Sequence, residues 1–106
     1  MGIPDSPNVL ALEGEIDLHV SPGIAASLAT MVAGHPARLV VDLSGVSYID
    51  SSGLAVLIKA MQSVEEYGGK LTLAGMNKNV RAIFEMARLD QFFLIFPHVD
   101  AALAAT

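Results

Sequence analysis

Two adjacent serines, Ser51 and Ser52, stand between Asp50 and Gly53, where an apolar run gives way to a helical pattern. Asp50 or Ser51 can cap the first turn of that helix, and Gly53 lets another backbone approach closely. The Ser52 hydroxyl then lies in the first turn, where the helix N-terminus carries partial positive charge. A phosphate there adds roughly −1.5 to −2 charge and meets free N–H groups. The simplest alternative is a plain capping sequence.

Other kinds of chemistry have less support. Ser, His and Asp are all present, but the Gly-x-Ser-x-Gly pattern of a serine nucleophile is absent. His19 is the histidine expected near the serine loop, whereas His35 and His98 stand beside prolines. The histidines lack metal-ligand spacing, and no Gly-x-x-x-x-Gly-Lys loop is present to hold a nucleotide. We therefore expect a binding protein and not an enzyme, with no catalytic residue, metal or cofactor.

Composition narrows the class of partner. Six basic against eleven acidic residues give a formal net charge of −5, which disfavours nucleic acid and anionic lipid surfaces. The hydrophobic content is 53%, yet no apolar run approaches the roughly 18 residues of a membrane span. This apolar surface is expected in a core or under a partner protein. The absence of cysteine and of a signal peptide favours a cytoplasmic protein without membrane insertion.

Hydrophobic periodicity predicts alternating strands and helices. Strands are expected at Val9–Ile16, Arg38–Leu43, Lys70–Ala74 and Phe93–Phe96, with Val46–Ile49 extending the second one after a turn at Ser44-Gly45. Helices are expected from Ser21 to a stop at Gly34-His35-Pro36, from the Ser52 segment to Gly68-Gly69, over Lys78–Leu89 and over Val99–Ala105. Ser21 is expected to cap the first helix, and Asn77 or Asn79 the third. Residues 1–8 are turn-rich and expected to be loose.

The resulting order is β-α-β-α-β-α-β-α. It predicts a single α/β domain over residues 1–106, with a mostly parallel four-stranded sheet covered by helices. In such folds, ligand and partner sites lie beyond the carboxyl ends of the strands. Two loops are expected there, Asp17-Leu18-His19 after the first strand and Asp50-Ser51-Ser52-Gly53 after the second.

Several stretches resemble the STAS domain family. Leu12–Asp17 is similar to its L-x-G-E-[LI]-D strand end, and Val40–Leu54 looks like its central strand, phosphorylation loop and helix start. Gly68–Leu71 and Asn79–Asp90 resemble the turn and helix that follow. The resemblance runs from about Leu10 to Phe96 and is most specific over Asp42–Leu54.

Within that family, the chain most resembles the anti-sigma-factor antagonists. The resemblance implies a STAS-like fold and a GHKL-type serine kinase, acting as an anti-sigma factor, as partner. It also implies that this kinase phosphorylates Ser52 and that a metal-dependent serine phosphatase reverses the reaction. Phosphate at the interface then releases the partner. The residues expected at the partner-binding site are Asp17, His19, Asp50, Ser51, Ser52, Gly53 and Leu54.

A different function is possible for the same fold. STAS domains also serve as subunits of membrane transporters, including lipid-trafficking ABC systems and anion transporters, where the same face would bind a transporter ATPase. Three departures from the family pattern are visible, the first of which is a short region after Phe96. His19-Val20-Ser21-Pro22 replaces a more usual polar run, which could alter partner choice. Only eight residues precede Val9, so the family's first strand is expected to be shortened or absent, which could leave a sheet edge free for a homodimer.

Overall fold

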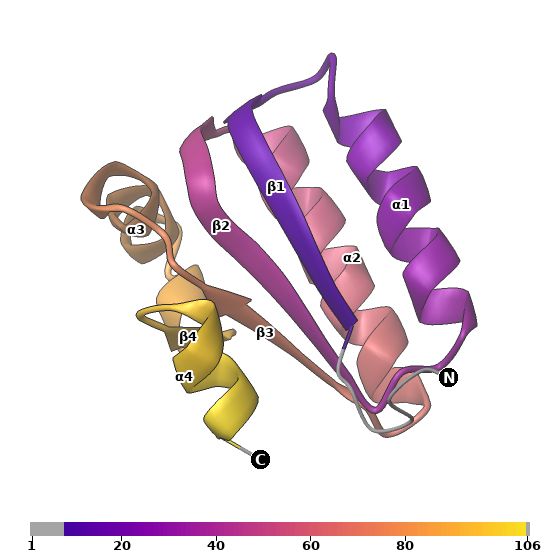
Figure 1. Cartoon of the computed structure of the whole chain (residues 1–106). Coiled ribbons are helices and arrows are strands. Elements are labelled where there is room, and N and C mark those ends of the chain that lie inside the picture. Colours follow the sequence, from indigo (N-terminus) through magenta and orange to yellow (C-terminus); the bar gives the residue numbers. More distant parts are fainter. Residues whose placement is uncertain (1–7, 106) are drawn as a thin grey trace.

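The structure, a computed structural model, describes residues 8–105. Its elements follow in the order β1 (Asn8–Ile16), α1 (Ser21–Ala33), β2 (Arg38–Ile49), α2 (Ser51–Glu66), β3 (Lys70–Ala74), α3 (Lys78–Met86), a 3-10 turn (Leu89–Gln91), β4 (Leu94–Phe96) and α4 (Val99–Ala104). The four strands form one sheet in the order β1-β2-β3-β4, and each pair is parallel (Figure 1). The predicted α/β fold with a parallel four-stranded sheet is confirmed.

Helices cover both faces of the sheet, which is why β2 reads as an almost continuous apolar run. On one face, Leu39 and Val41 belong to the main core, which also includes side chains from α1, α2 and α3. On the other face, Val40 and Ala74 of the sheet pack with Ala102 of α4. Figure 1 shows α1 and α2 side by side and α4 across the sheet from them. Because β1 and β2 are parallel neighbours, the helices that follow them, α1 and α2, start from the same edge of the sheet.

The predicted turn at Ser44-Gly45 is wrong, because β2 continues through it to Ile49. Register shifts of β1 against β2 absorb the irregularity on either side of Glu13 and Gly14. A side chain at Gly45 would place its Cβ 3.1 Å from Glu13 Cγ and 3.2 Å from the Leu12 carbonyl oxygen. This glycine therefore allows β1 to pass close to β2, and no turn is needed.

The predicted Ser21 cap is also wrong. Val20 holds the N-cap position of α1, and its side chain forms no capping hydrogen bond. The Ser21 hydroxyl donates instead to the Asp17 carbonyl oxygen at 2.7 Å. Asp17 orders the loop in front of the helix, because its Oδ1 accepts the main-chain N–H groups of His19 and Val20 at 2.9 and 3.3 Å.

The third helix is capped by Asn77, whose Oδ1 accepts the Val80 N–H at 2.9 Å. It ends at Met86, earlier than predicted, because Arg88 adopts a left-handed conformation with φ 60° that a helix cannot continue through. The last strand begins at Leu94, one residue later than predicted.

The predicted loose segment, residues 1–8, lies outside the described residues except for Asn8, which begins β1. The shortened or missing first strand likewise falls outside them. Among residues 8–105, no helix is both long and apolar enough to cross a membrane.

Candidate functional site

The two predicted loops lie side by side beyond the carboxyl ends of β1 and β2. Ile16 and Ile49, the last residues of these strands, are paired in register. Just beyond them, the Asp50 N–H donates to the Ile16 carbonyl oxygen at 3.0 Å. The loop Asp17–Val20 and the segment Asp50–Gly53 therefore share the upper edge of the sheet in Figure 1.

Asp50 is the N-cap of α2, as predicted, with an extended backbone at φ −102°. Its Oδ1 accepts the N–H groups of Ser52 and Gly53 at 2.9 and 3.3 Å and the Ser52 hydroxyl at 2.5 Å. The hydrogen bond from the Ser52 side chain is the main cause that holds the pKa of Asp50 below its usual value, against a smaller effect of burial. Ser51, the other candidate cap, is exposed.

Ser21 is a member of this site that the sequence did not indicate. Its Oγ lies 2.8 Å from Ser52 Oγ, although 31 residues separate the two serines. Ser21 is only 5% exposed, while Ser52 is half-buried. Contacts therefore run from Asp17 through Ser21 and Ser52 to Asp50. A serine before a proline at a helix start indicates a cap, so this pairing could be found only in three dimensions.

The packing around Gly53 leaves no room for a side chain. A Cβ at this position would lie 2.6 Å from Ile49 Cγ1 and 2.7 Å from Ile16 Cγ2, two fully buried side chains. The close neighbours are therefore side chains, and the expectation of an approaching backbone is wrong. Leu54 belongs to the core and is 9% exposed, so it supports the loop from within.

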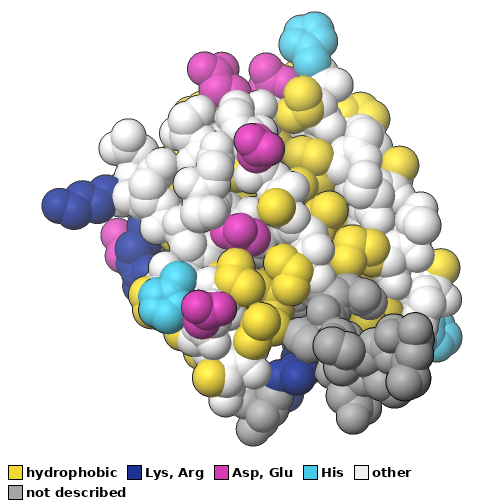
Figure 2. Space-filling view, viewed as in Figure 1, with side chains coloured by type: hydrophobic (Ala, Val, Ile, Leu, Met, Phe, Trp, Pro, Cys, Tyr) yellow, Lys and Arg dark blue, Asp and Glu magenta, His cyan; other side chains and the backbone are white. Residues whose placement is uncertain are grey.

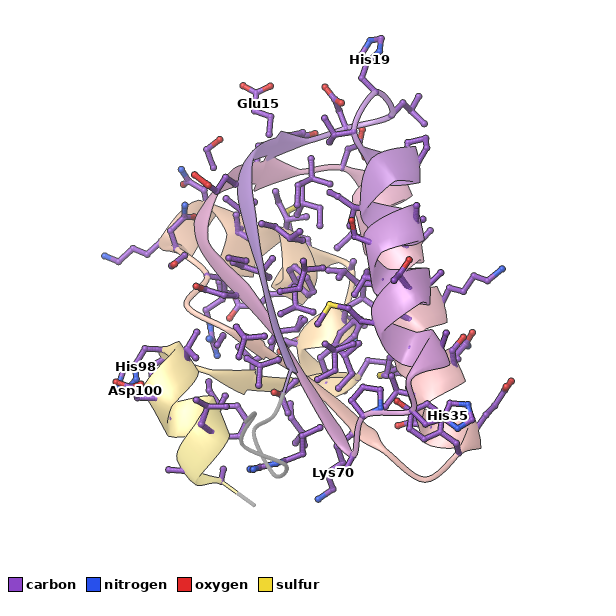
Figure 3. All side chains as sticks on the ribbon, turned by 45° about the vertical axis from the view of Figure 1, so that its right-hand side comes forward. Glu15, His19, His35, Lys70, His98 and Asp100 are labelled. Carbon is purple, nitrogen blue, oxygen red and sulfur yellow. The ribbon has the colours of Figure 1, made fainter. Side chains whose placement is uncertain are left out.

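The β1–α1 loop presents exposed side chains beside the serines. Leu18 is 73% exposed and Val20 is 42% exposed. His19 and Glu15 project into solvent from this end of the molecule, whereas His35 lies near the other end of α1 (Figure 3). Among residues 8–105, no group of three His, Cys, Asp or Glu side chains could hold a metal ion. The site therefore combines hydroxyl and carboxylate groups with an apolar rim.

Comparison with known proteins identifies the fold and its relatives. The model of the STAS domain family matches residues 2–102. The chain belongs to the STAS domain family. This STAS domain is 30% identical, over 95 residues, to the anti-sigma-F factor antagonist RsfB of Mycobacterium tuberculosis, and the match covers 90% of this chain and 77% of that protein.

Solved structures agree with this assignment. An anti-sigma factor antagonist from Mycobacterium paratuberculosis superposes with a TM-score of 0.86 at 28% identity, covering 99% of this chain and 97% of the other. A sulfate transporter family protein from Wolinella succinogenes gives a TM-score of 0.81 at 21% identity, covering 98% and 87% of the two chains. At that identity the second likeness shows the fold alone.

On one face of the STAS domain, the charged side chains are dispersed. On the face shown in Figure 2, acidic side chains are scattered, and Lys and Arg are confined to one side and the lower rim. No basic patch suited to nucleic acid is visible on this face. This distribution agrees with the net charge of −5.

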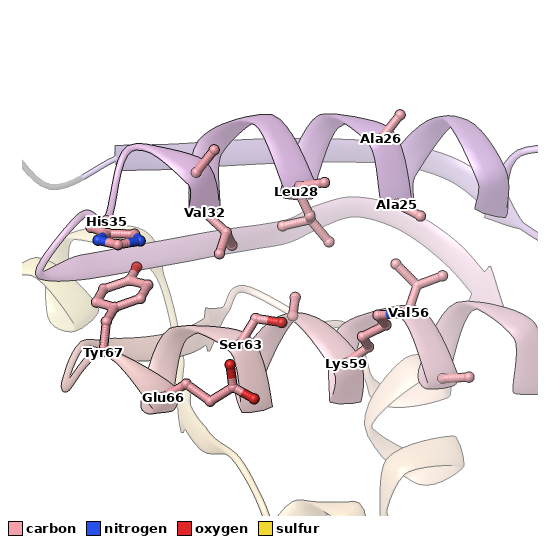
Figure 4. Close-up of a pocket in the computed structure, with 14 residues that line it drawn as sticks. Ala25, Ala26, Leu28, Val32, His35, Val56, Lys59, Ser63, Glu66 and Tyr67 are labelled. Atoms are coloured by element: carbon pink, nitrogen blue, oxygen red, sulfur yellow. The ribbon is translucent and has the colours of Figure 1, made fainter.

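A groove of about 890 Å³ lies between α1 and α2 (Figure 4). One end is closed by His35 stacked on Tyr67, with ring centroids 4.4 Å apart, and by the Tyr67 hydroxyl donating to the Pro36 carbonyl oxygen at 2.8 Å. Burial raises the pKa of Tyr67. The sequence signal for this surface is the composition of α1, Ser21–Ala33, which contains no charged residue. The other lining residues include Ala25, Ala29, Val32, Val56, Lys59 and Ser63.

Proposed function

We propose that this STAS domain is an anti-sigma-factor antagonist. It binds a GHKL-type serine kinase that acts as an anti-sigma factor, and phosphorylation of Ser52 ends the binding. The observation that carries the proposal is the placement of the Ser52 hydroxyl. It is half-buried at the start of α2, held by Asp50, at the sheet edge where STAS partners are expected. The relatives named as antagonists support the same reading.

The contacts of Ser52 suit a phosphoryl acceptor. Its single hydrogen is donated to Asp50 Oδ1, and Ser21 can donate to one lone pair of its oxygen. A second lone pair stays available to attack. Transfer from ATP forms the Oγ–P bond, breaks the bond from the γ-phosphorus to the oxygen that leaves with ADP, and passes the hydroxyl proton through Asp50 Oδ1 to solvent. The serine kinase supplies the nucleotide in this scheme.

The hydrogen bonds of Asp50 determine which groups a phosphate on Ser52 would meet. The sequence suggested that a phosphate would meet free N–H groups at this helix start, but the N–H groups of Ser52 and Gly53 already donate to Asp50. A phosphate on Ser52 therefore competes with a carboxylate for the same donors and lies against a like charge. Inside an interface this unpaired dianion is expensive to desolvate. We expect it to release the kinase without unfolding the domain.

The proposed partner surface consists of Asp17, His19, Ser51 and Ser52 with the exposed loop residues Leu18 and Val20. Asp50, Gly53 and Leu54 contribute to partner binding by fixing the shape of the loop. A metal-dependent serine phosphatase would restore the hydroxyl. A homodimer through a free sheet edge stays a prediction, to be checked by light scattering of the purified chain.

Capture from native lysate tests the proposal. The bait is the purified domain as wild type, Ser52→Ala, Ser52→Asp or Ser51→Ala, and the eluate is identified by mass spectrometry with a phosphosite map. We expect a GHKL-type kinase with wild type, Ser52→Ala and Ser51→Ala, little with Ser52→Asp, and phosphate on Ser52 only. Nearly equal capture by all four baits would sink the switch. Capture of a transporter ATPase, with Ser52 unmodified, would move the function to a transport complex.

A further inference from the structure

The hydroxyls of Ser21 and Ser52 take part in three contacts and have one hydrogen each to donate. Ser21 Oγ lies 2.7 Å from the Asp17 carbonyl oxygen and 2.8 Å from Ser52 Oγ, which lies 2.5 Å from Asp50 Oδ1. One contact therefore lacks a hydrogen at any moment. A carboxylate is the strongest of these acceptors, so the Ser52 hydrogen goes to Asp50. The Ser21 hydrogen is left to divide between the Asp17 carbonyl and Ser52.

Phosphorylation of Ser52 changes which acceptor receives the hydroxyl hydrogen of Ser21. Ser52 Oγ becomes an ester oxygen without a hydrogen, and it carries phosphate oxygens that are charged acceptors. These accept more strongly than the neutral Asp17 carbonyl. Ser21 is 5% exposed and cannot turn to bulk water, so its hydrogen moves to the phosphoserine. The Asp17 carbonyl then keeps only the N–H groups of Val20 and Ser21, at 3.2 and 2.9 Å.

We propose that Ser21 couples the phosphorylation state of Ser52 to the loop Asp17–Val20, so that a partner protein reads the state at two places. The loop is suited to this because Asp17 holds it through several hydrogen bonds and because it carries Leu18, which is 73% exposed. The inference rests on the proposed function for the origin of the phosphate. The coupling itself depends only on the contacts of Ser21.

The test compares the full chain carrying serine or genetically encoded phosphoserine at position 52. Amide resonances of Leu18, His19 and Val20 are followed by ¹⁵N NMR in wild type, Ser21→Ala and Ser21→Thr. We expect phosphoserine to shift these resonances in wild type and in Ser21→Thr. In Ser21→Ala, the shift should be at most roughly half as large. Ser27→Ala, which removes an exposed hydroxyl from the same helix, should behave as wild type.

Equal loop shifts with and without the Ser21 hydroxyl, or no shift in wild type, would overturn the coupling. Ser21→Thr guards against a mere folding defect, because it keeps the hydroxyl while changing the packing. The coupling through Ser21 and the proposed function can be refuted independently of each other. Absence of phosphate on Ser52 in the native host would remove the proposed function, yet the response to installed phosphoserine would still decide whether Ser21 is a coupling residue.

Discussion

Asp50 Oδ1 and Ser52 Oγ lie 2.5 Å apart, and the same carboxylate oxygen receives the N–H groups of Ser52 and Gly53. One oxygen therefore both caps α2 and orients the hydroxyl that we propose to be phosphorylated. Because a phosphate brings negative charge against this carboxylate, modification of Ser52 must disturb the cap as well as the partner surface. The switch and the start of α2 are thus expected to respond together.

The pH dependence of stability should reveal this contact. The pKa of Asp50 in the folded state lies below its ordinary value of 3.8, so ionised Asp50 stabilises the fold above that pH. This contribution is lost as the pH falls from about 5 through the folded-state pKa. Ser52→Ala removes the main cause of the lowering and should therefore lose less stability on acidification than wild type. Urea unfolding at about pH 7 and about pH 3 measures the difference.

Ser51→Ala is the matched control, because it deletes the adjacent, exposed hydroxyl. It should keep the acid sensitivity of wild type. A ¹³C NMR titration of the Asp50 carboxyl gives the same answer directly, with the pKa rising in Ser52→Ala. An unchanged pKa in that variant would mean that the Ser52 hydroxyl does not hold Asp50.

Gly53→Ala should destabilise the domain by about 1 to 3 kcal/mol, the usual cost of overpacking. Its Cβ would enter the contact between Ile16 and Ile49, at 2.7 and 2.6 Å from their side-chain carbons. Gly23→Ala on α1 is the control, since among residues 8–105 no atom outside its own turn of helix lies within 4 Å of the added Cβ. That variant should be neutral or gain about 0.5 to 1 kcal/mol. Urea midpoints that move equally for both variants would refute the packing argument.

The sequence predicted those parts of the fold that depend on local patterns. Lys70–Ala74 has the predicted bounds because this apolar run between Gly68-Gly69 and Gly75 is too short for a helix. Asp50 caps α2 because an Asp before an apolar helical stripe satisfies the first N–H groups through its own side chain. The alternation of such elements then fixes a parallel sheet and the edge where its loops meet.

The parts that could not be predicted depend on contacts between distant segments. Ser21 looks like a cap from its neighbours, and only the packing of α1 on α2 brings it to Ser52. Gly45 looks like a turn residue, and only the approach of β1 shows that it lies within a strand. The α1–α2 groove exists only where two helices meet, so the uncharged sequence of α1 alone does not locate it.

Thr72→Val should stabilise the domain by about 1 kcal/mol. Thr72 is 9% exposed in β3, and within residues 8–105 its Oγ1 has no hydrogen-bond partner. Valine replaces this hydroxyl with a methyl group of similar size beside Val40, its neighbour in the sheet. Thr30→Val, at an exposed position of α1, is the control and should change stability little. A loss of stability in Thr72→Val would show that the buried hydroxyl is bonded.

Leu18→Ala should weaken binding of the captured kinase about tenfold while changing stability by less than about 0.5 kcal/mol. The Leu18 side chain is 73% exposed in the free protein and belongs to the loop next to the serines, so only a complex would remove its apolar surface from water. Leu94→Ala is matched to it, being 53% exposed on β4, away from the β1–α1 loop (Figure 1). Calorimetric titration with the purified kinase measures the affinity of both variants. An equal loss of affinity in Leu18→Ala and Leu94→Ala would place the interface elsewhere.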